Sequence, residues 1–516
     1  MATVSLNSSE GKWVMATTIM ASAMAFIDGT ALNVILPSLQ RSLNASGADL
    51  FWILNAYLLM LASLTLIGGS LGDKLGRKRI FAWGIFIFLV GSALCGFAPN
   101  VFFLIIFRAI QGAGGALMIP GSLSLISSSI HEKERGKAIG TWSAVTTMVT
   151  IGGPVLGGAL GDAGLWRFIF FMNIPIGVVT LLLLWKKVKE VKGDDNDKKL
   201  DVAGAFTIAA GLALLTFGLL RIPAIGLYSP EVLVSLAAGL SFLIVFIWLE
   251  KRSKHPMMPL DLFSNMTFSG VNLLTFFLYA GLGAGMLFLG LNLVQVQGYS
   301  QLQSGLTFLP FTLLMIILAR YAGALADKHG PRIFLIAGPA IAGVGLLLLA
   351  FIKQTDGPKD YWTTFFPGIL IFGFGMSITV SPLTAAVMGA VSDRFSGTAS
   401  GINNAITRVS NVFANAIFGT LAVLFFATSL KDQLKTTDLS SVQKQHVIAQ
   451  AGNLGNAKVP ENITTQKKAT IEQEYREGFI NAYSYIMFLA SGLCFAGALM
   501  SVLFIKNDVI IKAKSE

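Results

Sequence analysis

The sequence predicts an all-α protein that crosses a membrane many times. Of its 516 residues, 54% are hydrophobic and only 13% are charged, about half the charged fraction of a typical soluble domain. Apolar runs of about 20 residues recur along the whole chain, and a helix of that length spans the roughly 30 Å hydrocarbon core of a bilayer. These observations indicate a polytopic membrane protein.

The apolar runs predict fourteen membrane-spanning helices. Their expected positions are 13–38, 50–71, 80–98, 101–129, 137–161, 166–185, 202–221, 231–250, 265–293, 303–326, 332–352, 362–389, 397–428 and 478–505. The first run is too long for the apolar part of a signal peptide, so we interpret it as a retained span. An even number of spans puts both termini on the same side of the membrane.

The net charge of +11 follows the membrane topology and does not indicate nucleic-acid binding. Lys and Arg gather in alternate loops, including 74–79, 133–137 and 186–199, whereas the short loops between them hold few. By the positive-inside rule, the basic loops face the cytoplasm. We therefore expect a cell (inner) membrane protein with both termini cytoplasmic and a polar outer segment, 429–477, that is flexible or hairpin-forming.

A charged run and an internal repeat divide the chain into units. The run 186–201, "KKVKEVKGDDNDKKLD", is expected to be a solvated cytoplasmic linker. The segment "GGSLGDKLGRKR" after the second span recurs as "GALADKHGPR" after the tenth, and transporters are often built from such repeats. The predicted units are an N-terminal six-helix bundle (1–185), the linker with two inserted helices (186–260) and a C-terminal six-helix bundle that carries the outer segment (261–516).

The repeated turn predicts a cytoplasmic latch between neighbouring helices. Its glycines permit a tight loop and close helix approach, and its aspartate can lie near a helix N-terminus or pair with an arginine. The expected latch residues are Gly69, Asp73, Gly76, Arg77, Asp327 and Arg332. A plain tight turn that obeys the positive-inside rule is the alternative.

The fourth predicted span contains an arginine, in "RAIQGAGGALMIPG". Arginine inside a membrane span is rare and usually functional, so Arg108 is a candidate functional residue. Gln111 lies three residues further on, which places it on the same helix face. An arginine that pairs only with backbone carbonyls is the structural alternative.

The fifth predicted span contains "TMVTIGGPVLGGALG". Its glycines and proline predict a helix that can kink and that neighbours can approach closely. The expected hinge residues are Gly153, Pro154, Gly157 and Gly158.

These segments, together with "DGTALNVILP" at 28–37 and "WRFIFFMNIPIG" at 166–177, resemble the signature segments of the major facilitator superfamily. More narrowly, they resemble its fourteen-helix drug:proton antiporter branch, over nearly the whole chain. The resemblance implies a major facilitator fold, with two six-helix bundles around a central cavity plus two inserted helices. It also implies export of hydrophobic small molecules or drugs by alternating access, driven by proton entry.

Two comparisons within the superfamily qualify this resemblance. Val149 stands where the branch often has a glycine, which weakens an argument from hinge flexibility. The fourteen-helix peptide symporters carry two glutamates, an arginine and aromatic residues in their first helix, and residues 13–38 have no such cluster.

Asp28 is the only carboxylate that the sequence puts well inside a predicted span. An ionised aspartate at mid-membrane costs about 2.5–3.5 kcal/mol, and while burial favours the protonated acid, a nearby cation favours the carboxylate. We therefore predict that Asp28 takes up and releases the coupling proton and that Arg108 stabilises its carboxylate. A local hydrogen bond with Thr30 or Asn33 is the alternative.

Other polar residues inside spans are candidates for lining the substrate cavity. They are Asn33, Asn55, Tyr57, Gln111, Asn272, Asn292, Gln295 and Asn411. Hydrogen bonding between helices is the alternative for most of them. Arg320 and Arg408 lie near the predicted cytoplasmic face, so snorkelling or a carboxylate partner would satisfy them without a substrate role.

The sequence does not indicate an enzyme or a metalloprotein. Cys95 and Cys494 lie in apolar runs, and no nucleophile–base pair, paired histidines or ATP-binding Gly-x-x-x-x-Gly-Lys-Ser/Thr loop is visible. We expect a monomeric secondary transporter in the lipid bilayer, with a hydrophobic small-molecule substrate and with the proton as its coupling ion in place of a cofactor. An exporter or importer of one specific lipophilic or acidic metabolite is the alternative function.

Overall fold

The computed structural model describes residues 4–190, 201–253, 256–391, 396–435, 437–460, 463 and 465–505, apart from a few side chains inside helices. The predicted linker 186–201 lies largely outside these residues. Within them the regular structure is helical, and a single isolated bridge pairs Val4 with Ile130.

The helices fall into three consecutive groups. The first comprises α1 (Ser9–Leu43), α2 (Gly47–Leu75), α3 (Arg77–Phe97), α4 (Val101–Ser129), α5 (Glu132–Asp162), α6 (Phe168–Phe171) and α7 (Asn173–Lys187). The second comprises α8 (Val202–Ile225) and α9 (Pro230–Arg252). The third comprises η1 (Leu260–Ser264), α10 (Met266–Gln295), α11 (Gln301–Thr307), α12 (Leu309–His329), α13 (Arg332–Ala350), η2 (Gly357–Asp360), α14 (Phe365–Gly389), α15 (Ser396–Gln433), α16 (Ser441–Ala449), η4 (Gln450–Asn456) and α17 (Thr465–Phe504).

Every predicted span coincides with helix in the structure. In the described part of the chain, 13 helical segments are long and apolar enough to cross a membrane. The segment that is not among them is α5, which covers the predicted span 137–161 and mixes charged residues, threonines and glycines with its apolar ones. The number of fourteen therefore stays a prediction, while the all-helical, multi-pass architecture is confirmed.

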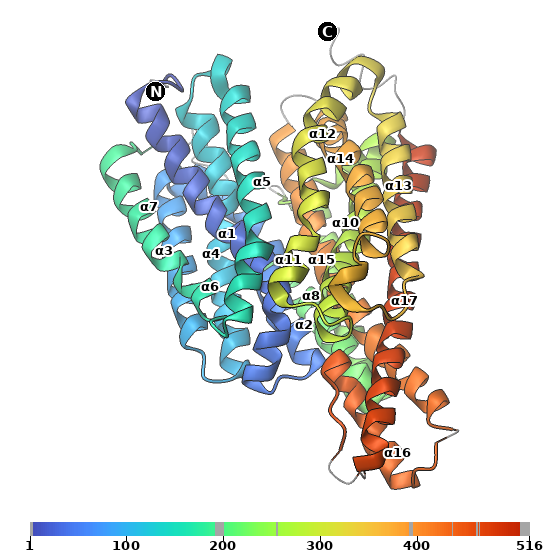
Figure 1. Ribbon diagram of the computed structural model, residues 1–516. Coiled ribbons are helices and arrows are strands. Elements are labelled where there is room, and N and C mark those ends of the chain that lie inside the picture. Colours follow the sequence, from blue (N-terminus) through green and yellow to red (C-terminus); the bar gives the residue numbers. More distant parts are fainter. Residues whose placement is uncertain are drawn as a thin grey trace.

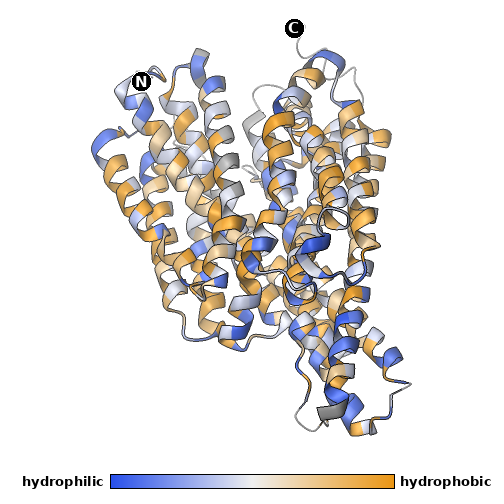
Figure 2. Cartoon of the chain, viewed as in Figure 1, coloured by the Kyte–Doolittle hydropathy of each residue, from blue (hydrophilic) through white to orange (hydrophobic). Residues whose placement is uncertain are grey.

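The first and third groups form two bundles that lie side by side (Figure 1). The start of α1 and the end of α17 lie at the same end of the molecule (Figure 1). Apolar residues cover the middle of both bundles and hydrophilic residues gather toward the ends, as a bilayer requires (Figure 2). Helix α8 packs on α9, α2 and α15, so the inserted pair contacts both bundles.

Glycines bring α4 close to α3, which fixes the helix that carries Arg108. A Cβ atom at Gly91 of α3 would lie 2.6 Å from the backbone nitrogen of Gln111. A Cβ atom at Gly114 of α4 would likewise overlap the backbone nitrogen of Phe88. The glycines of the fourth span therefore permit backbone contact between helices, as small residues do in membrane proteins.

The two copies of the repeated turn adopt the same backbone geometry. Gly76 ends α2 with φ 105° and Gly330 ends α12 with φ 85°, a region that favours glycine. Arg77 donates to the carbonyl of Ser124 (3.4 Å) and Arg332 to the carbonyl of Val502 (3.1 Å), so each arginine connects its turn to a further helix. For the other latch residues, the structure does not describe the side chains of Asp73 and Asp327 or the burial of Gly69. The latch function stays a prediction.

The outer end of the molecule, as we call the end away from the termini, carries a helical excursion. Beyond α15 the chain forms α16 and η4 and then returns into the bundle through α17. The segment that contains α16 and η4, which we call the outer excursion, projects past the bundles (Figure 1). Gln40 of α1 donates to the carbonyl of Asn453 (3.0 Å) and accepts from Asn456 (2.7 Å) and from Gln295 of α10 (3.0 Å). The excursion therefore binds the N-terminal bundle at the outer end.

A second contact at the outer end joins α5 to α11. The carboxylate of Asp162 accepts from the backbone N–H groups of Gln301 (2.7 Å) and Leu302 (3.0 Å). Burial alone would raise the pKa of Asp162, but hydrogen bonds from Ser300, Leu302 and Gln301 hold this pKa below its ordinary value of 3.8. The stabilisation is thus present above pH 3.8 and is lost only as the pH falls further, so this residue stays ionised near neutrality.

Closure of the outer end depends on a small residue in α5. A Cβ atom at Gly158 would lie 2.5 Å from the carbonyl oxygen of Gln301, whereas one at Gly152 would meet nothing within 4 Å. We expect Gly158→Leu to hold the outer end open because the larger side chain cannot fit against α11. The measurement is labelling of Asn33→Cys by a membrane-impermeant maleimide added to intact cells, in a chain whose two native cysteines are buried.

The labelling rate should rise several-fold in Gly158→Leu and stay unchanged in Gly152→Leu, a matched change on the same helix. Equal rates in the two variants would contradict the role of Gly158 in closure.

Candidate functional site

Asp28 of α1 forms a buried ion pair with Arg108 of α4. The distance from Arg108 Nη1 to Asp28 Oδ2 is 2.5 Å, and the two side chains are 1% and 0% exposed. Gln111 bridges the pair: its Nε2 donates to Asp28 Oδ1 (2.9 Å) and its Oε1 accepts from Arg108 Nη1 (2.7 Å). Both carboxylate oxygens therefore accept hydrogen bonds from α4, which is the arrangement that an ionised aspartate needs when buried.

Neighbouring residues complete the environment of the guanidinium. Arg108 Nε donates to the carbonyl of Ile53 (3.4 Å), and the Tyr57 ring lies 4.3 Å from Arg108 Cζ, a cation–π distance. Gly112 of α4 allows this approach because a Cβ atom there would overlap the carbonyl oxygen of Tyr57. Helix α2 thus covers the ion pair with the aromatic ring of Tyr57.

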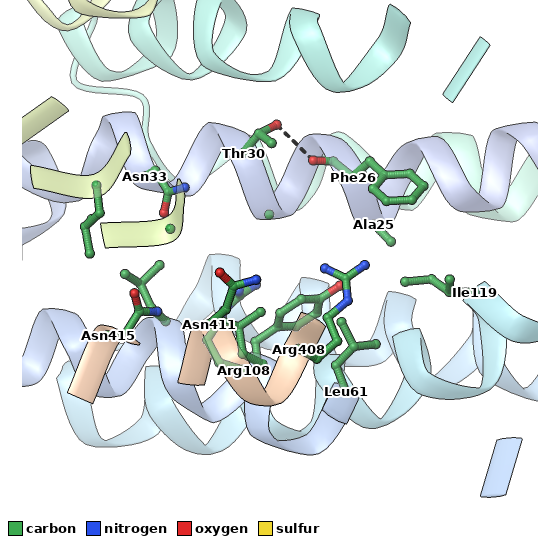
Figure 3. Close-up of a pocket in the computed structure, with 16 residues that line it drawn as sticks. Ala25, Phe26, Thr30, Asn33, Leu61, Arg108, Ile119, Arg408, Asn411 and Asn415 are labelled. Carbon is green, nitrogen blue, oxygen red and sulfur yellow. Dashed lines mark hydrogen bonds between the residues drawn. The ribbon is translucent and has the colours of Figure 1, made fainter. Parts of the chain in front are cut away.

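A pocket of about 170 Å³ lies beside this ion pair, between the two bundles. It is lined from α1, α2, α4, α10 and α15 (Figure 3). The lining residues are Ala25, Phe26, Gly29, Thr30, Asn33, Leu54, Tyr57, Leu58, Leu61, Arg108, Ile119, Gly283, Leu287, Arg408, Asn411 and Asn415. Asp28 is not in the wall, but its chain neighbour Gly29 and its partner Arg108 are, so the carboxylate lies directly behind the wall.

The structure divides the predicted cavity residues into two sets. Asn33, Tyr57 and Asn411 line the pocket. The others lie elsewhere, so their placement differs from the prediction: Gln111 is used in the ion pair, Asn272 accepts from Asn403 (3.0 Å), and Gln295 binds Gln40 at the outer end. Asn55 and Asn292 are fully buried, and among the described residues nothing hydrogen-bonds to their amide groups.

The predicted hinge residues of α5 pack closely on two different neighbours. A Cβ atom at Gly157 would lie 2.6 Å from the carbonyl oxygen of Ala31 in α1, while Gly158 faces α11 of the other bundle. Pro154 lies inside the helix, and its carbonyl oxygen would overlap a Cβ atom at Gly305 of α11. The close approach agrees with the prediction, and the bending of this helix stays a prediction.

Two pocket residues were not assigned a substrate role from the sequence. The sequence suggests snorkelling or a carboxylate partner for Arg408, and Asn415 is not among the predicted cavity residues. The structure directs both from α15 into the pocket (Figure 3). Their common spacing along one helix face was the available signal, but the sequence did not show which neighbour that face meets.

Comparisons with known proteins identify the family. The family model of the Major Facilitator Superfamily matches residues 18–415. The multidrug resistance protein Stp of Mycobacterium tuberculosis is 32% identical over 83% of this chain and 78% of its own. The chain belongs to the major facilitator superfamily. It is therefore a multi-pass membrane transporter and not an enzyme.

Two further likenesses agree with this family. The tetracenomycin C resistance and export protein of Streptomyces glaucescens is 26% identical over 96% of this chain and 91% of its own. A bacterial homologue of the human lysosomal transporter Spinster, solved in an inward-facing and unoccupied conformation, superposes with a TM-score of 0.67 at 18% identity, over 97% of this chain and 99% of that one. At this level of identity, the likeness to the solved structure is a likeness of fold alone.

Proposed function

We propose that this major facilitator transporter is a proton-coupled antiporter of the fourteen-helix drug:proton type, which exports hydrophobic small molecules. One observation carries the proposal: a buried Asp28–Arg108 pair lies directly behind the wall of a pocket between the two bundles. A titratable group in that position can couple a proton to whatever occupies the pocket. The similarity to relatives such as Stp, a multidrug resistance protein, supports the substrate class.

The proton acts on the ion pair. When Asp28 is ionised, Arg108 and Gln111 hold it against α4. Protonation removes the charge attraction, so α1 and α4 are free to adopt another arrangement and the guanidinium turns toward the pocket. Proton entry down a membrane potential supplies about 2.3 kcal/mol per charge per 100 mV, which drives the cycle toward export.

Alternating access follows from the two-bundle architecture in this proposal. The bundles meet at the outer end through Asp162 and Gln40, so opening outward requires breaking these contacts. We propose the division at 1–185, 186–260 and 261–516, a cell-membrane location with cytoplasmic termini, a monomeric state, and the proton as the only coupling agent, without a cofactor.

Everted membrane vesicles test the proposal. Respiration acidifies their interior, and a pH-sensitive dye reports the gradient. Addition of a transported compound should release protons and dissipate the gradient in vesicles that contain the wild-type protein, but not in vesicles without it. A panel of neutral, anionic and cationic lipophiles that fails to release protons, although one of them accumulates in the vesicles, would contradict proton antiport.

Transport of one specific acidic metabolite is the second candidate function. Arg408 in the pocket favours it, because a membrane-embedded guanidinium attracts an anionic substrate group. In everted vesicles an exporter accumulates its substrate, whereas an importer of the same compound does not.

A further inference from the structure

Arg408 is the charged group that the C-terminal bundle contributes to the pocket. It lies on α15, with Asn411 and Asn415 on the same side of the helix, and all three point toward the α1 residues across the pocket (Figure 3). Asn33 of α1 faces them (Figure 3). In addition to Arg108, the pocket therefore has a second guanidinium and three amides in its wall.

The structure describes no group that neutralises Arg408 within the residues it covers. Among the residues that the structure describes, none forms an ion pair or a hydrogen bond with its guanidinium, and the ionisable groups near it are the phenols of Tyr57 and Tyr279. A guanidinium placed in a membrane protein without a counterion is costly, so such groups normally pair or face water or a ligand. Within the described part of the chain, this arginine lacks the carboxylate partner that the sequence offered as one alternative.

The charge balance of the pocket is therefore positive in this conformation. The other arginine in the wall, Arg108, is neutralised by Asp28 at 2.5 Å. Asp28 is 0% exposed, and both of its oxygens are occupied by α4, so its charge is not available to a cation in the pocket. A cationic substrate would meet Arg408 without a compensating carboxylate, whereas an anion would find an unpaired guanidinium.

We propose that Arg408 binds an anionic group of the substrate, so that the compounds transported are lipophilic anions such as carboxylates or sulfonates. This inference rests on the proposed function, since it names the substrate class of the same pocket. Guanidinium groups bind carboxylate and sulfonate oxygens through parallel N–H donors, and the amides of Asn411 and Asn415 supply further donors beside it.

The size and lining of the pocket indicate how such a substrate lies. A volume of about 170 Å³ is smaller than the roughly 300–1,000 Å³ of sites that enclose a drug-sized ligand. The pocket thus accommodates the anionic end of an amphiphile, and the apolar part lies along Leu54, Leu58 and Leu287 and extends out of it. Arg408 is then a specificity residue that selects the charged end.

A binding experiment with two dyes of one skeleton tests this inference without a proton gradient. The full-length protein in lipid nanodiscs is titrated with 1-anilinonaphthalene-8-sulfonate and with uncharged N-phenyl-1-naphthylamine, and empty nanodiscs give the blank. We expect at least tenfold tighter binding of the sulfonate to the wild type. Arg408→Gln should lose at least tenfold affinity for the sulfonate and less than threefold for the neutral dye. The sulfonate affinity of Arg408→Lys should lie between the affinities of the wild type and of Arg408→Gln.

Arg320→Gln is the matched control, because it removes a membrane-embedded arginine of α12 that does not line the pocket. It should bind both dyes like the wild type. Equal affinity of the wild type for both dyes, an equal loss for both in Arg408→Gln, or the same loss in Arg320→Gln would overturn the inference. An equal loss would mean that Arg408 serves folding or conformational exchange only.

A second measurement uses only the wild type, so it does not depend on how a variant folds. Bound anilinonaphthalene sulfonate is displaced with 1-naphthoate and with 1-naphthylmethylammonium, which share an aromatic body and differ in charge. The carboxylate should compete at a concentration at least tenfold lower than the ammonium compound. The opposite order would overturn the inference, while proton antiport, measured in vesicles, could still hold.

Discussion

Asp28→Asn should abolish proton-driven export while leaving substrate exchange intact. Asparagine resembles the protonated acid in shape and cannot release a proton, so the variant has no carrier for the coupling ion. The amide oxygen of asparagine can still accept the hydrogen bond from Arg108, which limits the loss of stability, and the variant should therefore fold. The measurements are uptake driven by a pH gradient and counterflow without a gradient, both in proteoliposomes.

Gradient-driven transport should fall to the background of empty liposomes, whereas counterflow should stay within about threefold of the wild type. Glu231→Gln is the control, since it makes the same chemical change at an exposed carboxylate that pairs with Arg221 at the surface. Full gradient-driven transport by Asp28→Asn would remove this residue from the coupling role.

Arg108→Met should destabilise the protein strongly because it leaves the Asp28 carboxylate buried without a partner. Removing one member of a buried ion pair costs about 3–5 kcal/mol. Several contacts are lost together: the ion pair, the hydrogen bonds with Gln111 and with the Ile53 carbonyl, and the cation–π contact with Tyr57. The measurement is thermal unfolding of purified proteins in one detergent, monitored by size-exclusion chromatography.

The double variant Asp28→Asn/Arg108→Met distinguishes the charge from the packing. It removes both charges, so it should recover most of the stability that the single arginine variant loses, and it should still fail in gradient-driven transport. A double variant as unstable as Arg108→Met would show that the arginine stem, and not the unpaired carboxylate, determines the loss.

The pairing of Asp28 with Arg108 could be predicted because two charges in apolar spans have few other ways to be satisfied. The role of Gln111 could not be predicted in the same way. Its spacing from Arg108 put it on the correct face, yet it bridges the pair and does not line the cavity. Polarity inside a span indicates that a residue avoids lipid, but it does not say whether that residue meets a cavity or another helix.

Residues whose partners lie in the other half of the chain show the same limit. Arg408 and Tyr57 are more than 300 positions apart, and only the packing of α15 against α2 brings them near each other. Within the C-terminal bundle, Asn272 and Asn403 lie 131 positions apart, and the packing of α10 on α15 brings them together. By contrast, the turns at Gly76 and Gly330 were predicted from local sequence, since a tight helix end with positive φ is a property of a few adjacent residues.

The helical content of the outer excursion had a local signal that an apolar-run search does not detect. Ser440 and Gln443 form a capping box at the start of α16, in which each side chain binds the backbone of the other. Short polar helices of this kind are indicated by their caps and not by hydropathy. A search for caps between spans would have predicted helix here instead of a flexible loop.

Gln40 binds Asn453 and Asn456 in the closed arrangement, so each export event in the proposed cycle has to separate the excursion from α1 and then restore the contact. In the proposed orientation this surface faces the cell exterior. An antibody fragment that binds residues 441–456 together with the adjoining end of α1 would inhibit the transporter from outside the cell. Such an inhibitor would neither enter the cell nor compete with a substrate, and resistance to it could arise without any change in the transport pathway.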